Sequence, residues 1–337
     1  AAGVDSSDVE ARYAGSRRQA ENAMLVLADP LLVDLASAEL LIDENRHDEA
    51  LGHLEHLLKR YQELHGMENE SLPPDGGLSR CKHIAANLFC MGRVYMCQAK
   101  YNMALSAQQE ALRIQHQQLG QEHEDVAITL NSIAGVRLKQ GLCAEALEGL
   151  EECLRIRRRT LGGTHPLVAA TLKSIAGVHS ELGRYPEAAE GYLEALRVEK
   201  EAFGDEHIEV ARTLASLSGV FLSQGKADMA LEGLHKALRI ACERGEEHQL
   251  GAQVLHSIAA ALQAQGKYPE ALEALGHALQ IERGRLGGEH VTVAATLDST
   301  AGAYEGQARF SRALECYKEA LRIRRVRLGE GLDEAPA

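Results

Sequence analysis

The sequence has 337 residues and a formal net charge of −13, and 45% of its residues are hydrophobic but only 4% are aromatic. The negative charge argues against general nucleic-acid binding and against adsorption to anionic membranes, because both need a cationic face. No apolar run approaches the roughly 18 residues that span a bilayer. We therefore expect a soluble protein with no nucleic-acid partner and no membrane insertion.

The predicted elements begin with a helix in residues 1–29, which we interpret as an N-terminal capping helix. Residues 30–66 follow as two helices with a break at Asn45, and we interpret them as a degenerate first copy of a repeated unit. A loop insertion is expected at 67–79, because its Pro-Pro and Gly-Gly pairs disfavour helix.

A strict periodicity runs from 80 to 328, where an alanine marks the start of the second helix of each of six units. These marker alanines are Ala104, Ala146, Ala188, Ala230, Ala271 and Ala313, at spacings of 42 with one of 41. A glycine five residues earlier is expected to end the first helix with positive φ; these glycines are Gly141, Gly183, Gly225 and Gly266. Residues 329–337 form a C-terminal tail.

Each second helix repeats one apolar face, as in Ala188, Tyr192, Ala195 and Leu196, which lie at i, i+4, i+7 and i+8. Alanine at the recurring contact positions allows helix axes to approach closely. A single helical pair cannot bury such a face alone, so neighbouring pairs must stack on one another. The sequence therefore predicts an all-α solenoid of antiparallel helix pairs.

The units resemble tetratricopeptide repeats, with a small residue late in the first helix, glycine at the turn and alanine at two places in the second helix. The 42-residue length and the run L-G-G-T-H-P-L-V-A-A-T-L at 161–172 resemble the kinesin light chain type. The resemblance implies a right-handed superhelix whose concave groove, lined by the first helices, binds an extended peptide. In that family a T-L-N-N-L-A segment puts Asn side chains into the groove, and here only the segment 129–134 comes close.

Candidate groove residues follow from the register of the first helices. They are Arg93, Asn131, Ser132, Lys139, Lys173, Ser174, Arg212, Ser216, His256 and Ser257. Serines at one helical position, with glycines such as Gly219 and Gly302 three residues beyond, predict a polar trough into which a partner's backbone fits. The alternative, which stays open, is that small residues serve only the packing of the first helices against one another.

Charges on these helices predict the chemistry of the partner. Arg93, Lys139, Lys173 and Arg212 would give the groove a mildly basic recess, suited to an acidic or extended peptide segment of a protein partner. The alternative is that these residues are ordinary solvated positions.

The sequence does not support metal binding, phosphate binding or catalysis. Histidines recur once per repeat, but they lie about 10 Å or more apart, too far for one Zn²⁺; we interpret them as residues that start the first helix. They are His123, His165, His207, His248 and His290. No phosphate-binding glycine loop, nucleophile elbow or HExxH motif is present. We therefore expect no catalytic residue, no metal and no cofactor, and the chain is predicted not to be an enzyme.

The seven cysteines contain no CxxC pair, and most occupy apolar positions of helical patterns. We interpret them as reduced core residues, which favours a cytoplasmic location; an organelle interior, reached after removal of a targeting peptide, stays open. The leading hypothesis for function is a non-enzymatic scaffold or adaptor that binds a partner peptide or helix in the groove. The alternative is a structural subunit of a large assembly, held by its convex face, its edges or the 67–79 loop.

Overall fold

The computed structural model describes residues 30–66, 76–243 and 250–328. The helix predicted within 1–29, residues 67–75 of the predicted loop and the tail 329–337 lie outside the described residues. Every regular element within the described residues is a helix. The chain divides into two compact units, one ending at Leu182 and the other beginning at Gly183.

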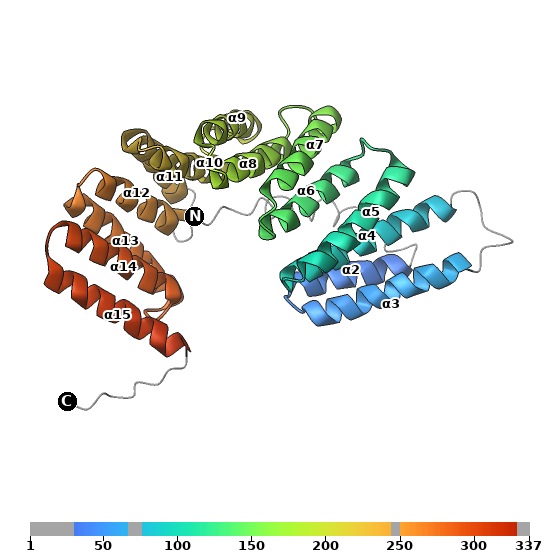
Figure 1. The fold of residues 1–337 in the computed structure, drawn as a ribbon, viewed down its shortest axis with the longest axis horizontal. Helices are drawn as coiled ribbons and strands as arrows, with labels where there is room; N and C mark the ends of the chain where they lie inside the picture. Colours follow the sequence, from blue (N-terminus) through green and yellow to red (C-terminus); the bar gives the residue numbers. More distant parts are fainter. Residues whose placement is uncertain (1–29, 67–75, 244–249, 329–337) are drawn as a thin grey trace. The chain divides into compact units, whose positions relative to one another are not determined.

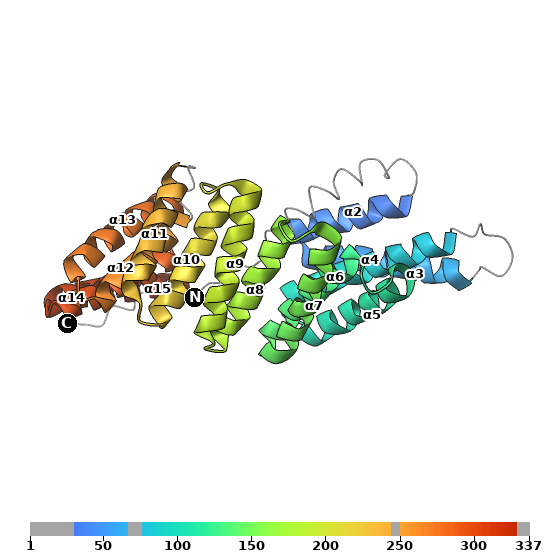
Figure 2. The same cartoon turned by 90° about the horizontal axis from the view of Figure 1, so that it is seen from above.

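The unit that ends at Leu182 consists of antiparallel helix pairs in which each helix packs against the next (Figures 1 and 2). Its helices are α2 (Pro30–Asp43), α3 (His47–Gly66), α4 (Gly76–Cys97), α5 (Tyr101–Leu119), α6 (Glu124–Lys139), α7 (Cys143–Leu161) and α8 (Pro166–Glu181). We call α2, α4, α6 and α8 A helices and α3, α5 and α7 B helices. Each A helix pairs with the B helix that follows it in this unit, and each B helix also contacts the next A helix.

The unit that begins at Gly183 follows the same order (Figure 1). Its helices are α9 (Tyr185–Phe203), α10 (Ile208–Ser223), α11 (Ala227–Glu243), α12 (Ala252–Ala264), α13 (Tyr268–Leu286), α14 (Val291–Gly306) and α15 (Phe310–Leu328). The A helices α10, α12 and α14 pair with the B helices α11, α13 and α15, and α12 also contacts both α10 and α14. This layering brings equivalent positions of three successive A helices next to one another.

Two details of the helix bounds differ from the sequence prediction. Helix α4 begins at Gly76, so the last four residues of the predicted 67–79 loop are helical. Gly76 and Gly77 begin the helix, where the first N–H groups have no intrahelical partner in any case. The B helices begin three residues before their marker alanines, as α5 does at Tyr101 before Ala104.

The recurring histidines cap the A helices. The Nδ1 atoms of His123, His165, His207 and His290 each accept a hydrogen bond from the backbone N–H two residues later, at 3.2–3.3 Å. A side-chain acceptor at the N-cap satisfies one of the first backbone donors of a helix. The prediction that these residues start the first helix of each unit is confirmed, and His248 lies outside the described residues.

The turn inside each helix pair contains one residue in the left-handed region, five residues before the marker alanine. The glycines predicted for it, Gly141, Gly183, Gly225 and Gly266, have φ of 77°, 72°, 74° and 74°. The remaining pairs place non-glycine residues there: Asn45, Ala99 and Ala308, with φ of 59°, 57° and 57°. The backbone of the repeat therefore imposes this conformation even where the sequence carries a Cβ.

We expect Ala99→Gly and Ala308→Gly each to raise the free energy of unfolding by about 0.5–1 kcal/mol. A Cβ in the left-handed region costs about 1–2 kcal/mol, and the greater freedom of glycine in the unfolded chain offsets part of that gain. Urea unfolding followed by circular dichroism measures the change. Gly225→Ala, at the same turn position, is the matched control and must lose stability; a gain there contradicts this explanation.

Candidate functional site

The A helices of the unit that begins at Gly183 present a row of small side chains on one face. We call this row the small-residue face. It comprises Ser216, Gly219 and Ser223 on α10, Ser257, Ala260 and Ala264 on α12, and Ser299, Gly302 and Gly306 on α14. The same i, i+3, i+7 spacing recurs on all three helices, and each of these residues is exposed or half-buried. The repeat register thus builds one continuous solvent-facing row.

Two glycines of this face, Gly219 and Gly302, are not required by the packing of the unit. A Cβ added at Gly219 or at Gly302 would meet no atom within 4 Å. In the other unit, a Cβ at Gly135 would make only an ordinary contact, 3.6 Å from Cε of Met96. The alternative that small residues serve only helix packing therefore does not account for Gly219 or Gly302.

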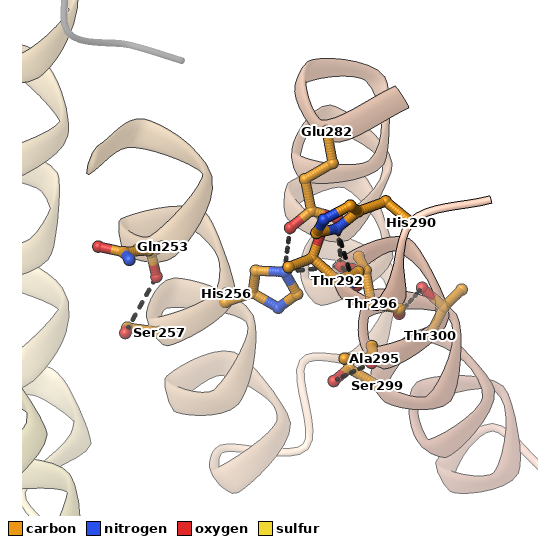
Figure 3. A network of polar contacts seen from close by, with 10 residues as sticks. All are labelled: Gln253, His256, Ser257, Glu282, His290, Thr292, Ala295, Thr296, Ser299 and Thr300. Carbon is orange, nitrogen blue, oxygen red and sulfur yellow. Dashed lines mark hydrogen bonds and ion pairs between the residues drawn. The ribbon is translucent and has the colours of Figure 1, made fainter. Parts of the chain in front are cut away.

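The serines of the face use their hydrogens within their own helices. Ser216, Ser257 and Ser299 donate to the carbonyl oxygens four residues earlier, at 3.2 Å (Figure 3 shows the last two). Ser174, at the equivalent position of α8, does the same at 3.1 Å. Because each hydroxyl has one hydrogen, these serines offer an approaching partner mainly acceptor oxygens and little bulk.

Arg212 and His256, two predicted groove residues of this unit, are engaged in contacts between residues of the protein. Arg212 Nε lies 3.5 Å from Glu209 Oε1, and both side chains are only 14% exposed. His256 Nε2 lies 3.2 Å from Oε1 of the buried Glu282 and 2.8 Å from Thr296 Oγ1. Figure 3 shows how this network links α12, α13 and α14. His256 therefore connects helices more than it faces solvent.

The predicted groove residues of the other unit lie on three helices. Arg93 of α4 faces Asp43 of α2 at 3.8 Å, Lys139 is exposed in the last turn of α6, and Lys173 of α8 is half-buried. Arg212, the fourth predicted groove cation, belongs to the unit that begins at Gly183.

The two polar α6 residues of the prediction, Asn131 and Ser132, are placed differently from what the resemblance implies. Asn131 is only 9% exposed, so its side chain lies in the core more than on the surface. Ser132 is half-buried and accepts a hydrogen bond from Gln108 Nε2 at 2.6 Å. Both residues contribute to the packing of α6, and we draw no binding role from them.

Polar contacts between B helices and the next A helices were missed at the sequence level. Arg157 of α7 is fully buried, and its Nη1 donates to Thr171 Oγ1 of α8 at 2.7 Å. Glu282 occupies the equivalent position of α13, eleven residues after the marker alanine, and accepts from Thr296 Oγ1 at 2.6 Å. The sequence carried a signal for these contacts. Residues of different types occupy this buried position in successive repeats, and such variation indicates a specific pairing with the next helix.

The recess between α4, α5 and α6 has little room for a small molecule. This recess, lined by residues such as Lys82, Phe89 and Asp125, encloses about 40 Å³, far below the 300–1,000 Å³ usual for ligand pockets. No group of three or more His, Cys, Asp or Glu residues within the described ranges could hold a metal ion. Among the same residues, no helix combines the length and apolarity needed to cross a membrane.

The cysteines are all free thiols, and the prediction that they are core residues is only partly correct. Cys90 and Cys153 are buried, as expected of core residues. Cys97 and Cys242 are exposed, so the interpretation of the group as core residues is wrong for these two. Both lie at the ends of helices, α4 and α11, where an apolar pattern no longer ensures burial.

Comparison with known proteins decides the family. The profile of the tetratricopeptide repeat matches residues 83–148, 125–198, 174–243 and 252–325, which together make up most of the chain. The chain belongs to the tetratricopeptide repeat family. No curated protein sequence matches it.

Solved structures with tetratricopeptide repeats (TPRs) and related folds resemble the chain. Nearly identical TPR-like repeats of a candidate kinesin light chain from Podosopora anserina are 24% identical, with a TM-score of 0.56, and cover 61% of this chain and 98% of that one. RapI is 17% identical, with a TM-score of 0.60 and coverage of 90% and 100%. A Rap protein complexed with Competence and Sporulation Factor is 16% identical, with a TM-score of 0.54 and coverage of 89% and 76%. These likenesses concern the fold, and they agree with an all-α TPR solenoid.

Proposed function

We propose that this TPR protein is a non-enzymatic scaffold that holds a helix or extended segment of a protein partner on its small-residue face. TPR proteins serve as protein-interaction modules, and the Rap protein solved with Competence and Sporulation Factor is a case of a related fold holding another molecule. The observation that carries the proposal is the open space at Gly219 and Gly302, where side-chain bulk is absent although no neighbouring atom excludes it.

The chemistry of the face indicates what kind of segment fits it. Glycine, alanine and serine allow a partner's backbone to approach closely, and the serine oxygens accept hydrogen bonds from it. Two charged residues of these A helices are already paired, Arg212 with Glu209 and Asp298 with Arg324. We therefore propose shape and backbone contacts, more than charge, as the basis of recognition here. The acidic partner suggested by Arg93, Lys139 and Lys173 stays a prediction for the other unit.

The double variant Gly219→Arg/Gly302→Arg tests this proposal. It is expected to abolish partner binding, because two long side chains would occupy the face, while the helices fold normally since neither Cβ meets another atom within 4 Å. Co-purification of the partner with the tagged chain from its native source, with circular dichroism of the purified variant, measures both effects.

The matched control is Gly276→Arg/Gly284→Arg. Both glycines lie within α13 and are exposed, and a Cβ added at either would meet no atom within 4 Å, so the control adds the same charge and bulk on a B helix. It is expected to retain the partner. Binding that survives the A-helix variant, or is lost equally in both variants, would overturn the proposed face.

A further inference from the structure

The last described helix, α15, exposes a stripe of apolar side chains at positions that the inner B helices bury or half-bury. Phe310, Leu314, Tyr317 and Leu321 are 66%, 54%, 37% and 48% exposed, and they lie at i, i+4, i+7 and i+11 on one side of the helix. The position of Tyr317 is at most 9% exposed in every earlier 42-residue unit, where it is Gln108, Leu150, Tyr192, Leu234 or Leu275. At the inner joints this surface is the one that meets the next A helix.

The first described A helix, α2, exposes the complementary position. Leu40 lies ten residues before Ala50, which is the marker alanine of the first copy, and it is 62% exposed. The equivalent residues of later A helices are at most 2% exposed; they are Val94, Val136, Val178, Val220, Ala261 and Ala303. Both exposed positions, on α2 and on α15, thus belong to the kind of joint that the inner repeats bury.

The two helices also have opposite charge. Helix α2 contains Asp34, Glu39 and Asp43 and no lysine or arginine, a formal charge of −3. Helix α15 contains six basic and two acidic residues, a formal charge of +4. Lys318 and Arg325 of α15 are exposed, and within the described residues neither has an ion-pair partner. The opposite formal charges of the two helices favour their encounter, although Asp43 also lies 3.8 Å from Arg93 of α4.

We propose that two copies of this chain associate head to tail, with α15 of one copy packed against α2 of the next. The contact would reproduce the B-to-A joint that the array already makes between its own repeats, with the apolar stripe of α15 covered by the face of α2 that contains Leu40. Such an interface is heterologous, because it uses two different surfaces of the same chain. It leaves the small-residue face free, so it does not depend on the proposed partner site.

Sedimentation of the purified chain over a range of concentrations tests the proposal. The unmodified chain is expected to form assemblies that grow with concentration and shrink as salt is added, because part of the attraction is between charges. Leu40→Glu alone and Leu314→Glu/Leu321→Glu alone are each expected to leave only monomer. Leu193→Glu in α9, a residue that is 52% exposed, is the matched control and is expected to assemble as the unmodified chain does.

Mixing the two blocked variants distinguishes this contact from any symmetric one. Each variant keeps the surface that the other has lost, so the mixture is expected to give a 1:1 dimer and nothing larger. The proposal is overturned if the unmodified chain stays monomeric at every concentration, or if Leu40→Glu assembles as strongly as the unmodified chain. If circular dichroism shows that a glutamate variant has lost helix, serine at the same position repeats the test with a milder change.

Discussion

Leu196→Ala is expected to lower the free energy of unfolding by about 2–4 kcal/mol, within the range observed for leucine truncation in protein cores. Leu196 lies on α9, is 6% exposed, and belongs to the apolar face through which α9 packs against α10. The truncation leaves a cavity that two rigid helices cannot close completely. Urea unfolding followed by circular dichroism, with hydrogen exchange of the α9 and α10 amides, measures the loss and locates it.

Leu321→Ala is the matched control, because Leu321 occupies the same repeat position on α15 and is 48% exposed. Its truncation removes little surface that folding had buried, so the expected loss is under about 1 kcal/mol. Equal losses at the two positions, measured on monomeric protein, would mean that α15 is covered in solution even without a second copy. That result would contradict the explanation given for its exposed stripe.

Gly306→Ala is expected to destabilise the last repeats by about 1–3 kcal/mol, the usual effect of forcing extra volume into a packed contact. Gly306 ends α14, and a Cβ there would lie 2.2 Å from Cε1 of Tyr268, at the start of α13. The tyrosine ring is rigid, so the whole side chain must move to make room. Thermal or urea unfolding of the purified variant measures the change.

Two further variants identify the cause. Gly302→Ala, one turn earlier on α14, places a Cβ in open space and is expected to be neutral or stabilising by up to about 1 kcal/mol, since alanine is the better helix former. Tyr268→Ala reproduces the residue that α11 carries at this position, Ala227, and is expected to remove the penalty of Gly306→Ala. A penalty that persists in the Gly306→Ala/Tyr268→Ala double variant would rule out the steric explanation.

The helices and their order could be predicted from the sequence because the same sequence signals recur in successive repeats. The spacing of the marker alanines set the register, the turn glycines set the left-handed position, and the histidines indicated where A helices begin. The same repetition explains Ala99 and Ala308, whose positive φ no local propensity would predict. One of the bounds that failed lies at the edge of the regular array, at Gly76, where one copy departs from the pattern.

The candidate site was harder to predict, because a side chain's register position does not say which partner it has. Arg212 and His256 were placed on the right helices but engage Glu209 and Glu282, and Asn131 is buried. The Arg212–Glu209 pair lies within α10, whereas the His256–Glu282 contact forms between two helices and depends on which residue the facing helix carries. The serine and glycine positions were easier to predict, since they need only the register and no partner.

Photo-crosslinking from position 260 of the intact chain tests the proposed partner face most directly. Ala260 is exposed in the middle of the small-residue face on α12, and Gly276 is an exposed position on the B helix α13. A benzophenone side chain at each position, irradiated in the native extract and analysed by mass spectrometry, reports what lies against each surface. We predict one partner segment crosslinked from position 260 and not from position 276. Crosslinks to a partner from position 276 alone would contradict the proposal.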